Sequence, residues 1–251
     1  MFKSIKLMFS RAWLLTTCLV FLAILLTIRL GFWQLDRLNQ EKNINSHILS
    51  VQAMPELNLS GNLIGINLTD MEYRPAMAIG FLDFEKQVVI RNQVWIQSWG
   101  NEIGYTLLTP LILQNGQAVL VQRGWIPLTY DTPSSWHKFD QPGEVSIQGI
   151  IRLPLEKGEM GGGVPDPTLI PGQDSLFFWN YVNINRIQQQ LPYEVLPIYI
   201  QQAPVTDEEI LPYQSIPILE LTDGAHLGYA LQWFFYALLL ILGYPIFIRK
   251  H

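Results

Sequence analysis

The chain has 251 residues, of which 49% are hydrophobic and only 15% are charged. Its mean hydropathy is positive, which excludes a disordered protein and an ordinary soluble domain, so part of the apolar excess is expected in lipid. The net charge of −5 offers no basic surface for nucleic acid, and we expect no DNA or RNA binding. A single cysteine, Cys18, excludes an intramolecular disulfide and a thiolate metal site.

The first apolar run covers residues 12–28 without a charge and continues past Arg29 to residue 33. A helix over 12–33 would be about 33 Å long, close to the hydrocarbon core of about 30 Å, so we predict a transmembrane helix there. The run exceeds the apolar core of a signal peptide and no A-x-A-like cleavage site follows it. These features favour an uncleaved anchor.

A second apolar run, residues 226–248, contains no Asp, Glu, Lys or Arg and is followed by Arg249 and Lys250. Basic residues lie outside the two runs, and all acidic residues fall between Asp36 and Asp223. The positive-inside rule therefore predicts cytoplasmic tails at 1–11 and 249–251 and a periplasmic domain over 34–225. Only ten residues precede Arg11, too few for a transit peptide, so we expect a multi-pass protein of the bacterial inner (cell) membrane.

Short apolar runs punctuated by Gly, Pro and Asn predict strands between the two spans, at 85–91, 105–113, 118–121, 145–152 and 195–201. Pro110 marks an edge or a break in the second of these strands. Asn115-Gly116 predicts a hairpin with a type I′ turn. The predicted fold class is a membrane protein whose two transmembrane α-helices flank one mainly antiparallel β (α+β) extracytoplasmic domain.

Helices outside the membrane are expected only at 32–45, as a continuation of the first span, and at 183–191, before Pro192. The segment 156–174 contains three consecutive glycines and three prolines, and we predict a mobile loop. It is not a phosphate cradle, because the Gly-Lys-Ser/Thr ending of such loops is missing.

Catalytic patterns are scarce between the spans. The segment holds two histidines before the second span, His47 and His137, and no cysteine. Ser134 or Ser135 beside His137 could form a hydrolase pair, but neither lies in a G-x-S-x-G elbow, so an exposed turn is the favoured interpretation. No metal-binding spacing occurs. We therefore expect no enzyme.

His226 begins the second span, and Tyr229, Ala230 and Trp233 follow on the same helix face. Imidazole is a common axial ligand of haem iron, and aromatic rings beside a small residue suit a flat porphyrin. Aromatic residues also gather at membrane interfaces in any membrane protein, where a boundary histidine can bond to head groups or water. Both interpretations stay open on the residues alone.

The end of the first span carries Arg29, Trp33 and Arg37 at helical spacing. These arginines could pair with haem propionates or with lipid phosphates, and lipid anchoring is the default. If the two spans are adjacent, their outer ends would form a cleft open to lipid.

Several motifs of the chain resemble the Surfeit locus protein 1 family of cytochrome c oxidase assembly factors. The resemblance is most specific in V-Q-R-G-W-I-P at 121–127 and in H-L-G-Y-A-L-Q-W at 226–233. Weaker matches are found in residues 31–37 with Lys42, 73–81, 91–92, 104–111 and 115–120.

The resemblance implies a respiratory-chain assembly factor, a chaperone that supplies haem a to subunit I of cytochrome c oxidase. Its implied partners are subunit I, the lipid bilayer and haem A synthase. His226 takes the place of the proposed axial ligand of the haem iron, and the full expected binding set is His226, Tyr229, Trp233, Trp33 and Arg37. The family-typical Asn-Pro before this histidine is Gly224-Ala225 here, and a Trp-then-Asp element appears as Trp179 with Asn183.

Two other expectations accompany this hypothesis. The first is a haem-independent scaffold, anchored in the membrane, that stabilises an oxidase assembly intermediate. The second concerns Arg123-Gly124-Trp125, where a glycine between two large residues after a β run favours a bulge or a close backbone approach over a partner contact. Arg123 is then expected to bond to a backbone carbonyl or to an acid within the domain.

Overall fold

The structure is a computed structural model that describes residues 7–97, 100–155, 164–168, 175–205, 210–217, 219 and 221–250. It divides into two compact units. The helical unit comprises residues Met1–Leu49 and Leu219–His251, and the β unit comprises Ser50–Ile218. Most of the predicted loop 156–174 lies outside the described residues; its described part, 164–168, is in neither a helix nor a strand.

Both predicted spans are helices that are long and apolar enough to cross a membrane. Helix α2 (Leu14–Gln52) begins two residues later than the predicted span and contains the whole of the continuation predicted for 32–45. Helix α5 (His226–Lys250) begins at the predicted residue. Few of their side chains are buried, which distinguishes both helices from the core helices of a soluble protein.

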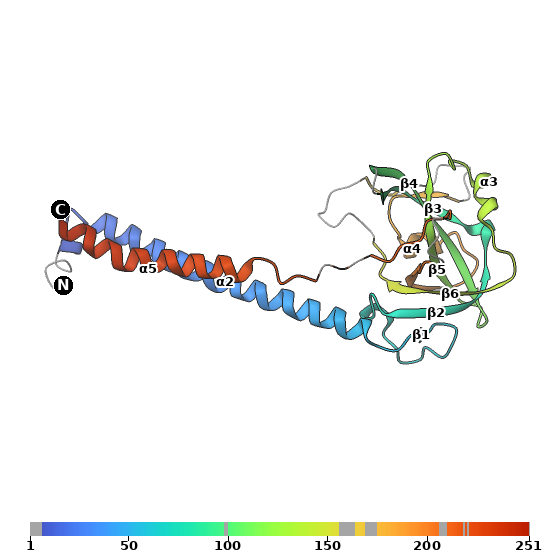
Figure 1. Cartoon of the computed structure of the whole chain (residues 1–251), viewed down its shortest axis with the longest axis horizontal. Coiled ribbons are helices and arrows are strands. Elements are labelled where there is room, and N and C mark those ends of the chain that lie inside the picture. The colour runs from blue at the N-terminus through green and yellow to red at the C-terminus, as the bar shows by residue number, and fades with distance from the viewer. Residues whose placement is uncertain are drawn as a thin grey trace. The chain divides into compact units, whose positions relative to one another are not determined.

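The two helices lie side by side and antiparallel, as Figure 1 shows. Near the start of α2, the Thr17 hydroxyl lies 2.7 Å from the hydroxyl of Tyr244, close to the end of α5. Farther along α2, the ring of Phe32 meets the ring of Phe234 edge-on at 5.4 Å. The start of α2 and the end of α5 therefore lie at the same end of the pair.

The β unit is an eight-stranded mixed sheet in the order β1-β2-β6-β8-β5-β4-β3-β7. Most neighbours are antiparallel, whereas β1–β2, β3–β7 and β5–β8 are parallel. The strands are β1 (Leu57–Asn58), β2 (Pro75–Leu82), β3 (Val88–Gln97), β4 (Gly100–Leu113), β5 (Ala118–Pro127), β6 (Glu144–Arg152), β7 (Phe178–Trp179) and β8 (Val195–Gln202).

The sheet closes on itself, because β2 pairs with β4 as well as with β6. The ring therefore runs β2-β6-β8-β5-β4 and back to β2 (Figure 1). Side chains two residues apart on four of the ring strands, and four residues apart on β6, fill its interior: Ala76, Ala78, Leu111, Leu113, Val119, Val121, Ile147, Ile151, Ile198 and Ile200. This spacing is the period-2 alternation of strands with one face turned to a core.

Each of the five predicted strands is present, and β3, β4 and β5 extend beyond their predicted bounds, but β3 begins at Val88, so the strand predicted from residue 85 starts three residues too early. Helix α4 (Ile184–Gln188) lies within the predicted 183–191, with the side chain of Asn183 as its N-cap. The sequence analysis missed β2, β1, β7, the short helix α3 (Pro133–Trp136) and three 3₁₀ turns, η1 (Leu68–Asp70), η2 (Phe84–Lys86) and η3 (His137–Phe139).

Two local predictions need correction. The hairpin between β4 and β5 exists, but Asn115 keeps a negative φ and only Gly116 is left-handed, at +83°. The Gly116 N–H donates to the Leu113 carbonyl, and the Leu113 N–H donates to the Gln117 carbonyl. This pattern is a type I turn followed by a glycine bulge, not a type I′ turn.

Pro110, expected at an edge or a break, lies inside the unbroken strand β4 and pairs with Leu120 of β5. On the edge of β4 that faces away from β5, β3 is the neighbour up to Leu108 and β2 is the neighbour from Leu111. Pro110 lies between these two pairings. The missing proline N–H therefore falls in the gap between two ladders, where no strand partner requires it.

Candidate functional site

His226 lies where α5 begins and is held by a polar contact with α2. Its Nδ1 lies 2.8 Å from Oε1 of Gln34. An amide oxygen only accepts hydrogen bonds, so Nδ1 carries the proton, and in the neutral ring Nε2 then keeps its lone pair. Among the residues described by the structure, Nε2 has no hydrogen-bond partner. His226 therefore offers one free ring nitrogen of fixed tautomer.

Gly224 keeps the space beside this nitrogen open. Its φ is +65°, and a Cβ at this position would lie 3.3 Å from Nε2 and 3.1 Å from Cδ2 of His226. A side chain here would be strained and would crowd the free nitrogen. The Gly-Ala that replaces the family-typical Asn-Pro therefore leaves room around the imidazole.

The segment before His226 is fixed to α2 by two further contacts. The Asn45 side chain donates to the carbonyl of Thr222 at 3.1 Å, and Lys42 lies 4.0 Å from Asp223. Both partners of the ion pair are half exposed, so it contributes little stability but restrains the direction of the chain.

Close packing of the helices sets the depth at which His226 meets Gln34. A Cβ on Gly31, one turn before Gln34, would lie 2.5 Å from the ring of Phe234, so only glycine admits this ring. Ala230 of α5 is completely buried. The small gap expected there for a porphyrin is not open, because the helical unit already covers this residue.

Tyr229 and Trp233 lie on the flank of the His226 face. Tyr229 is 52% exposed, and the half-buried Trp233 packs edge-on against Tyr236 with the ring centroids 6.0 Å apart. Both rings are thus accessible to a flat apolar ligand beside His226.

Trp33 and Arg37 have no hydrogen bond or ring contact with His226 among the described residues. At about 100° per residue, Trp33 lies about 200° around α2 from Gly31, and 46% of it is exposed. Arg37 bonds within its own helix, to Gln40 at 2.8 Å and to Glu41 at 3.4 Å. The cleft expected between both outer ends stays a prediction, because within the described residues no hydrogen bond or ring contact links Trp33 or Arg37 to His226. The binding roles of Trp33 and Arg37 stay predictions.

These residues fit a haem in two respects. The lone pair of Nε2 is free, and the position beside it is occupied by a glycine. Within the described ranges, no group of three or more His, Cys, Asp or Glu side chains is placed to hold a metal ion. Gln34 is the partner that sequence reasoning missed.

The alternative hydrolase pair is not assembled. The Ser135 hydroxyl donates to the Thr132 carbonyl at 2.6 Å, and His137 Nδ1 lies 2.9 Å from Asp140. Within the described part of the chain, neither Ser134 nor Ser135 is hydrogen-bonded to His137. The local contacts are those of an exposed turn with short-range caps.

Arg123 has the structural role that was expected. It is 2% exposed and donates to Gln87 at 3.0 Å and to the Phe139 carbonyl. Burial lowers the pKa of its guanidinium to about 10, against the opposing charge of Asp140. Arg123 is the extra residue of a β-bulge, since Leu107 pairs with Gly124 and Leu108 with Gln122.

The comparisons with known proteins agree with these motifs. The sequence model of the SURF1 family matches residues 21–238. A SURF1-like protein of Rickettsia conorii is 26% identical over 239 residues, which cover 94% of this chain and 92% of the relative. The Surfeit locus protein 1 of Xenopus tropicalis is 24% identical over 226 residues, or 83% and 67% of the two chains. Since the family match covers most of the chain, including the whole β unit and parts of both helices, the chain belongs to the SURF1 family.

Proposed function

We propose that this chain is a membrane-anchored assembly factor of cytochrome c oxidase that holds haem a at His226 and delivers it to subunit I. Family membership implies the role in oxidase assembly. The observation that supports the haem-binding part is the hydrogen bond between His226 and Gln34, which leaves Nε2 free to donate its lone pair.

In this proposal the chain presents Nε2 of His226 as a ligand and neither makes nor breaks a covalent bond of the haem. Gln34 fixes the tautomer and the ring orientation, as outer-shell partners of ligating histidines commonly do. Tyr229 and Trp233 supply apolar surface for a macrocycle. The bound haem would supply an iron that accepts the Nε2 lone pair, and a single axial donor suits cargo that must be released.

The proposed location is the bacterial inner membrane, with both termini in the cytoplasm and the β unit in the periplasm. The edge-on contact of Trp13 with Phe247 brings the basic Arg11 to the same end of the pair as Arg249 and Lys250. Basic residues at one end of two spans favour a cytoplasmic position for that end. Haem A synthase is a further proposed partner, as the source of the cargo.

The test is purification of the full chain from cells that make haem a, followed by optical spectra and haem quantification. We expect His226→Ala to lose haem by at least about tenfold relative to the parent. His47→Ala is the matched control, a histidine replaced in the same unit, and should keep the parental content. Equal haem in His226→Ala and the parent would remove His226 as the ligand.

A second candidate function, a haem-independent scaffold, is supported by the free end of the β3–β4 ribbon. Val94 pairs with Ile103 across the ribbon, and Ile96 lies on the same face. Their exposed fractions are 52%, 57% and 77%, an unusual exposure for a cluster of large apolar side chains. Such a face suits a protein partner.

The two functions separate in a co-purification experiment with subunit I. A scaffold predicts that subunit I is retained by His226→Ala and lost when Val94, Ile96 and Ile103 are all replaced by serine. A haem carrier predicts that the serine variant still contains haem. The control replaces three polar residues of the β4–β5 turn with alanine: the exposed Gln114 and Asn115 and the half-buried Gln117.

A further inference from the structure

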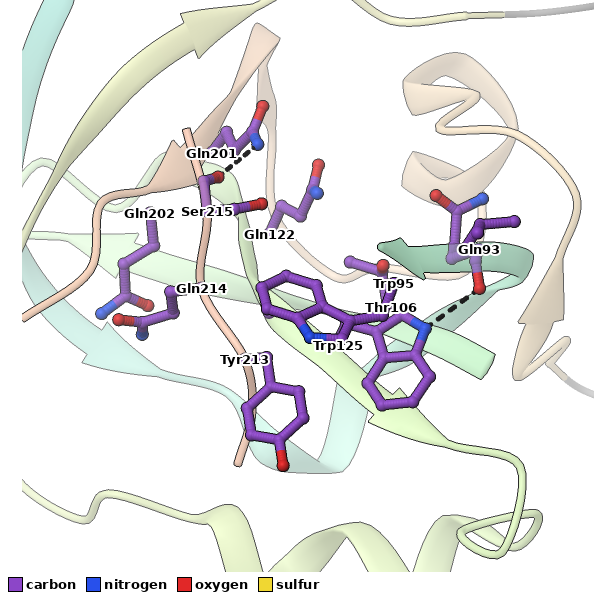
Figure 2. Close-up of a pocket in the computed structure, with 12 residues that line it drawn as sticks. Gln93, Trp95, Thr106, Gln122, Trp125, Gln201, Gln202, Tyr213, Gln214 and Ser215 are labelled. Atoms are coloured by element: carbon purple, nitrogen blue, oxygen red, sulfur yellow. Dashed lines mark hydrogen bonds between the residues drawn. The ribbon is translucent and has the colours of Figure 1, made fainter. Parts of the chain in front are cut away.

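The β unit contains a cavity of about 170 Å³ that the proposed haem site does not use. It lies between β3, β5, the end of β8 and the segment around Tyr213, as Figure 2 shows. None of the described residues that line it is charged. Its polar lining is dominated by five glutamines: Gln93, Gln122, Gln201, Gln202 and Gln214.

One wall of the cavity is a rigid cluster of three aromatic rings. The rings of Trp125 and Tyr213 are nearly parallel, 5° apart, with centroids separated by 5.8 Å, and Trp95 lies 5.2 Å from Tyr213. Backbone hydrogen bonds of 2.8 Å join Trp125 and Tyr213 in both directions, and the Trp125 indole donates to the Gln93 carbonyl (Figure 2). The cavity is therefore formed before any ligand arrives.

Several polar groups that face this cavity are left without a partner. Gln201 is satisfied, since it bonds to Arg152 and to the Ser215 carbonyl. In contrast, the side chains of Thr106 and Gln202 make no hydrogen bond to any described residue, although only 4% and 6% of these residues are exposed. The indole N–H of Trp95 is buried and also lacks a partner. A guest in the cavity could form hydrogen bonds with Thr106 and Gln202, and a buried group such as the Trp95 N–H normally has a partner.

We propose that this cavity binds a single neutral sugar ring. Amides and hydroxyls both donate and accept, which matches the dual character of sugar hydroxyls, and aromatic rings offer apolar surface to the C–H groups of a pyranose. The volume is close to that of a cavity of about 150 Å³ that binds benzene, which limits the ligand to a single ring and excludes a disaccharide.

Other classes of ligand fit less well. A carboxylate or phosphate would be buried without a counter-charge, which is costly. A flat heteroaromatic ring carries fewer groups that both donate and accept hydrogen bonds than a ring bearing hydroxyls, so it would use less of the amide and hydroxyl lining. This site is independent of His226, so either proposal can fail without the other.

The experiment is a sugar titration of the full chain in lipid nanodiscs, free of maltoside detergents because their head groups are sugars. The signal is the indole N–H resonance of Trp95, assigned through Trp95→Phe. Glucose and N-acetylglucosamine should each shift it saturably, with dissociation constants on the order of millimolar, as expected for a ligand of this size. Gluconate and glucosamine, which are charged, should leave it unchanged.

Substitutions of residues that line the cavity test whether the sugar binds there. Thr106→Val keeps the shape of the side chain and removes its hydroxyl, and Gln202→Leu removes the amide; each should weaken binding about fivefold or more. The control Gln114→Leu, in an exposed turn, should bind like the parent. If a buried variant does not fold by its melting curve, Gln122→Leu, at a half-buried lining position, replaces it.

Two results would overturn the proposal. The first is the lack of a saturable shift with either neutral sugar, which would identify the cavity as water-filled. The second is equal affinity in the parent, Thr106→Val and Gln202→Leu, which would place any sugar binding elsewhere.

Discussion

The helical unit and the β unit are stabilised by different means. The helical unit leaves large apolar side chains exposed along both helices, and a few specific contacts fix its register: Thr17 with Tyr244, Gly31 with Phe234 and Gln34 with His226. The β unit instead buries side chains inside a closed ring of strands. Loss of one contact should therefore affect ligand binding in the first unit and folding stability in the second.

The comparison also shows that a highly recognisable sequence motif need not carry the candidate chemistry. The V-Q-R-G-W-I-P run carried much of the family resemblance, yet Arg123 and Gly124 in it form a bulge and a buried hydrogen-bond network. The candidate chemistry depends on Gln34 and His226, which lie 192 residues apart. Highly recognisable residues in this chain thus include ones whose role is to shape the barrel.

The largest expected effect is that of Arg123→Met. It would leave the Phe139 carbonyl without its Arg123 donor and would leave Gln87 with only the Thr109 hydroxyl as donor, at a cost of about 3 kcal/mol in the free energy of unfolding. The melting temperature of the β unit should fall by roughly 6–12 °C. Near-UV circular dichroism on heating measures this change.

The controls for Arg123→Met test the separation of the units. Lys86→Met, which replaces a half-buried cation of the same unit, should change the free energy of unfolding by no more than about 0.5 kcal/mol. Haem content should be parental in both variants. A folded Arg123→Met protein that had lost its haem would contradict the division of roles.

Gly31→Val should disturb the helical unit next most strongly. The added side chain overlaps the Phe234 ring and costs about 1–3 kcal/mol through overpacking. The readout is cross-linking of Thr17→Cys to Tyr244→Cys, in a Cys18→Ser background, by a bifunctional thiol reagent that spans the length of the removed tyrosine ring, together with haem content, and both should decrease. Gly228→Val is the matched control, because a Cβ at Gly228 meets nothing within 4 Å.

Gln34→Leu should weaken haem binding by about 10–100-fold, the usual loss when an outer-shell partner of a ligating histidine is removed. Gln34→Glu keeps an acceptor for Nδ1–H and should retain most of the affinity. Optical titration of the purified apoprotein with haem measures both. Equal affinity in Gln34→Leu and the parent would show that the hydrogen bond does not position the ring.

The smallest effect concerns alkaline pH and the β unit. Burial raises the pKa of Tyr193, and so does its hydrogen bond to Asp83; burial also raises the pKa of Tyr199. A raised folded-state pKa gives stability that is complete below the unfolded value of about 10 and is lost as pH rises above it. Arg123, with its pKa lowered to about 10, changes stability in the opposite direction. It contributes one titrating proton, whereas Tyr193 and Tyr199 contribute two, so the effect of the tyrosines is the larger.

The melting temperature of the β unit should therefore decline above about pH 10. Tyr193→Phe should make this decline shallower and cost about 1 kcal/mol at neutral pH, where Asp83 loses its hydrogen bond. Melting curves recorded between pH 7 and pH 11 provide the measurement. An unchanged alkaline slope in Tyr193→Phe would assign the decline to other groups.

Local signals in the sequence predicted much of the fold. The hairpin at Asn115-Gly116 and the helix capped by Asn183 depend on neighbouring residues, and both were found. Strand β2 was missed because P-A-M-A-I-G-F-L has few β-branched residues and begins with proline. Its Gly80 lets β2 approach β4 closely, since a Cβ there would overlap the Ile112 carbonyl. Ring closure thus follows from a pairing between distant segments.

The site was half predictable for a similar reason. His226 was identified from its own helix, whereas Gln34 reads as one more polar residue at a helix end. A usable signal was present in the positions: Gln34 lies 34 − 11 = 23 residues after Arg11, and His226 lies 249 − 226 = 23 residues before Arg249. The two spans are antiparallel and their basic ends lie on the same side. Two residues that are equally far along the chain from these basic ends therefore lie at the same depth.

Strand β8 is the last strand of the chain, yet it is inserted between β5 and β6. During synthesis the barrel cannot close until residue 202 has emerged, so every shorter nascent chain presents two open edges. A premature stop before Val195 would leave β5 and β6 unpaired along these edges, where they could recruit strands of other molecules. Truncated products of this protein should therefore aggregate rather than persist as partly functional fragments.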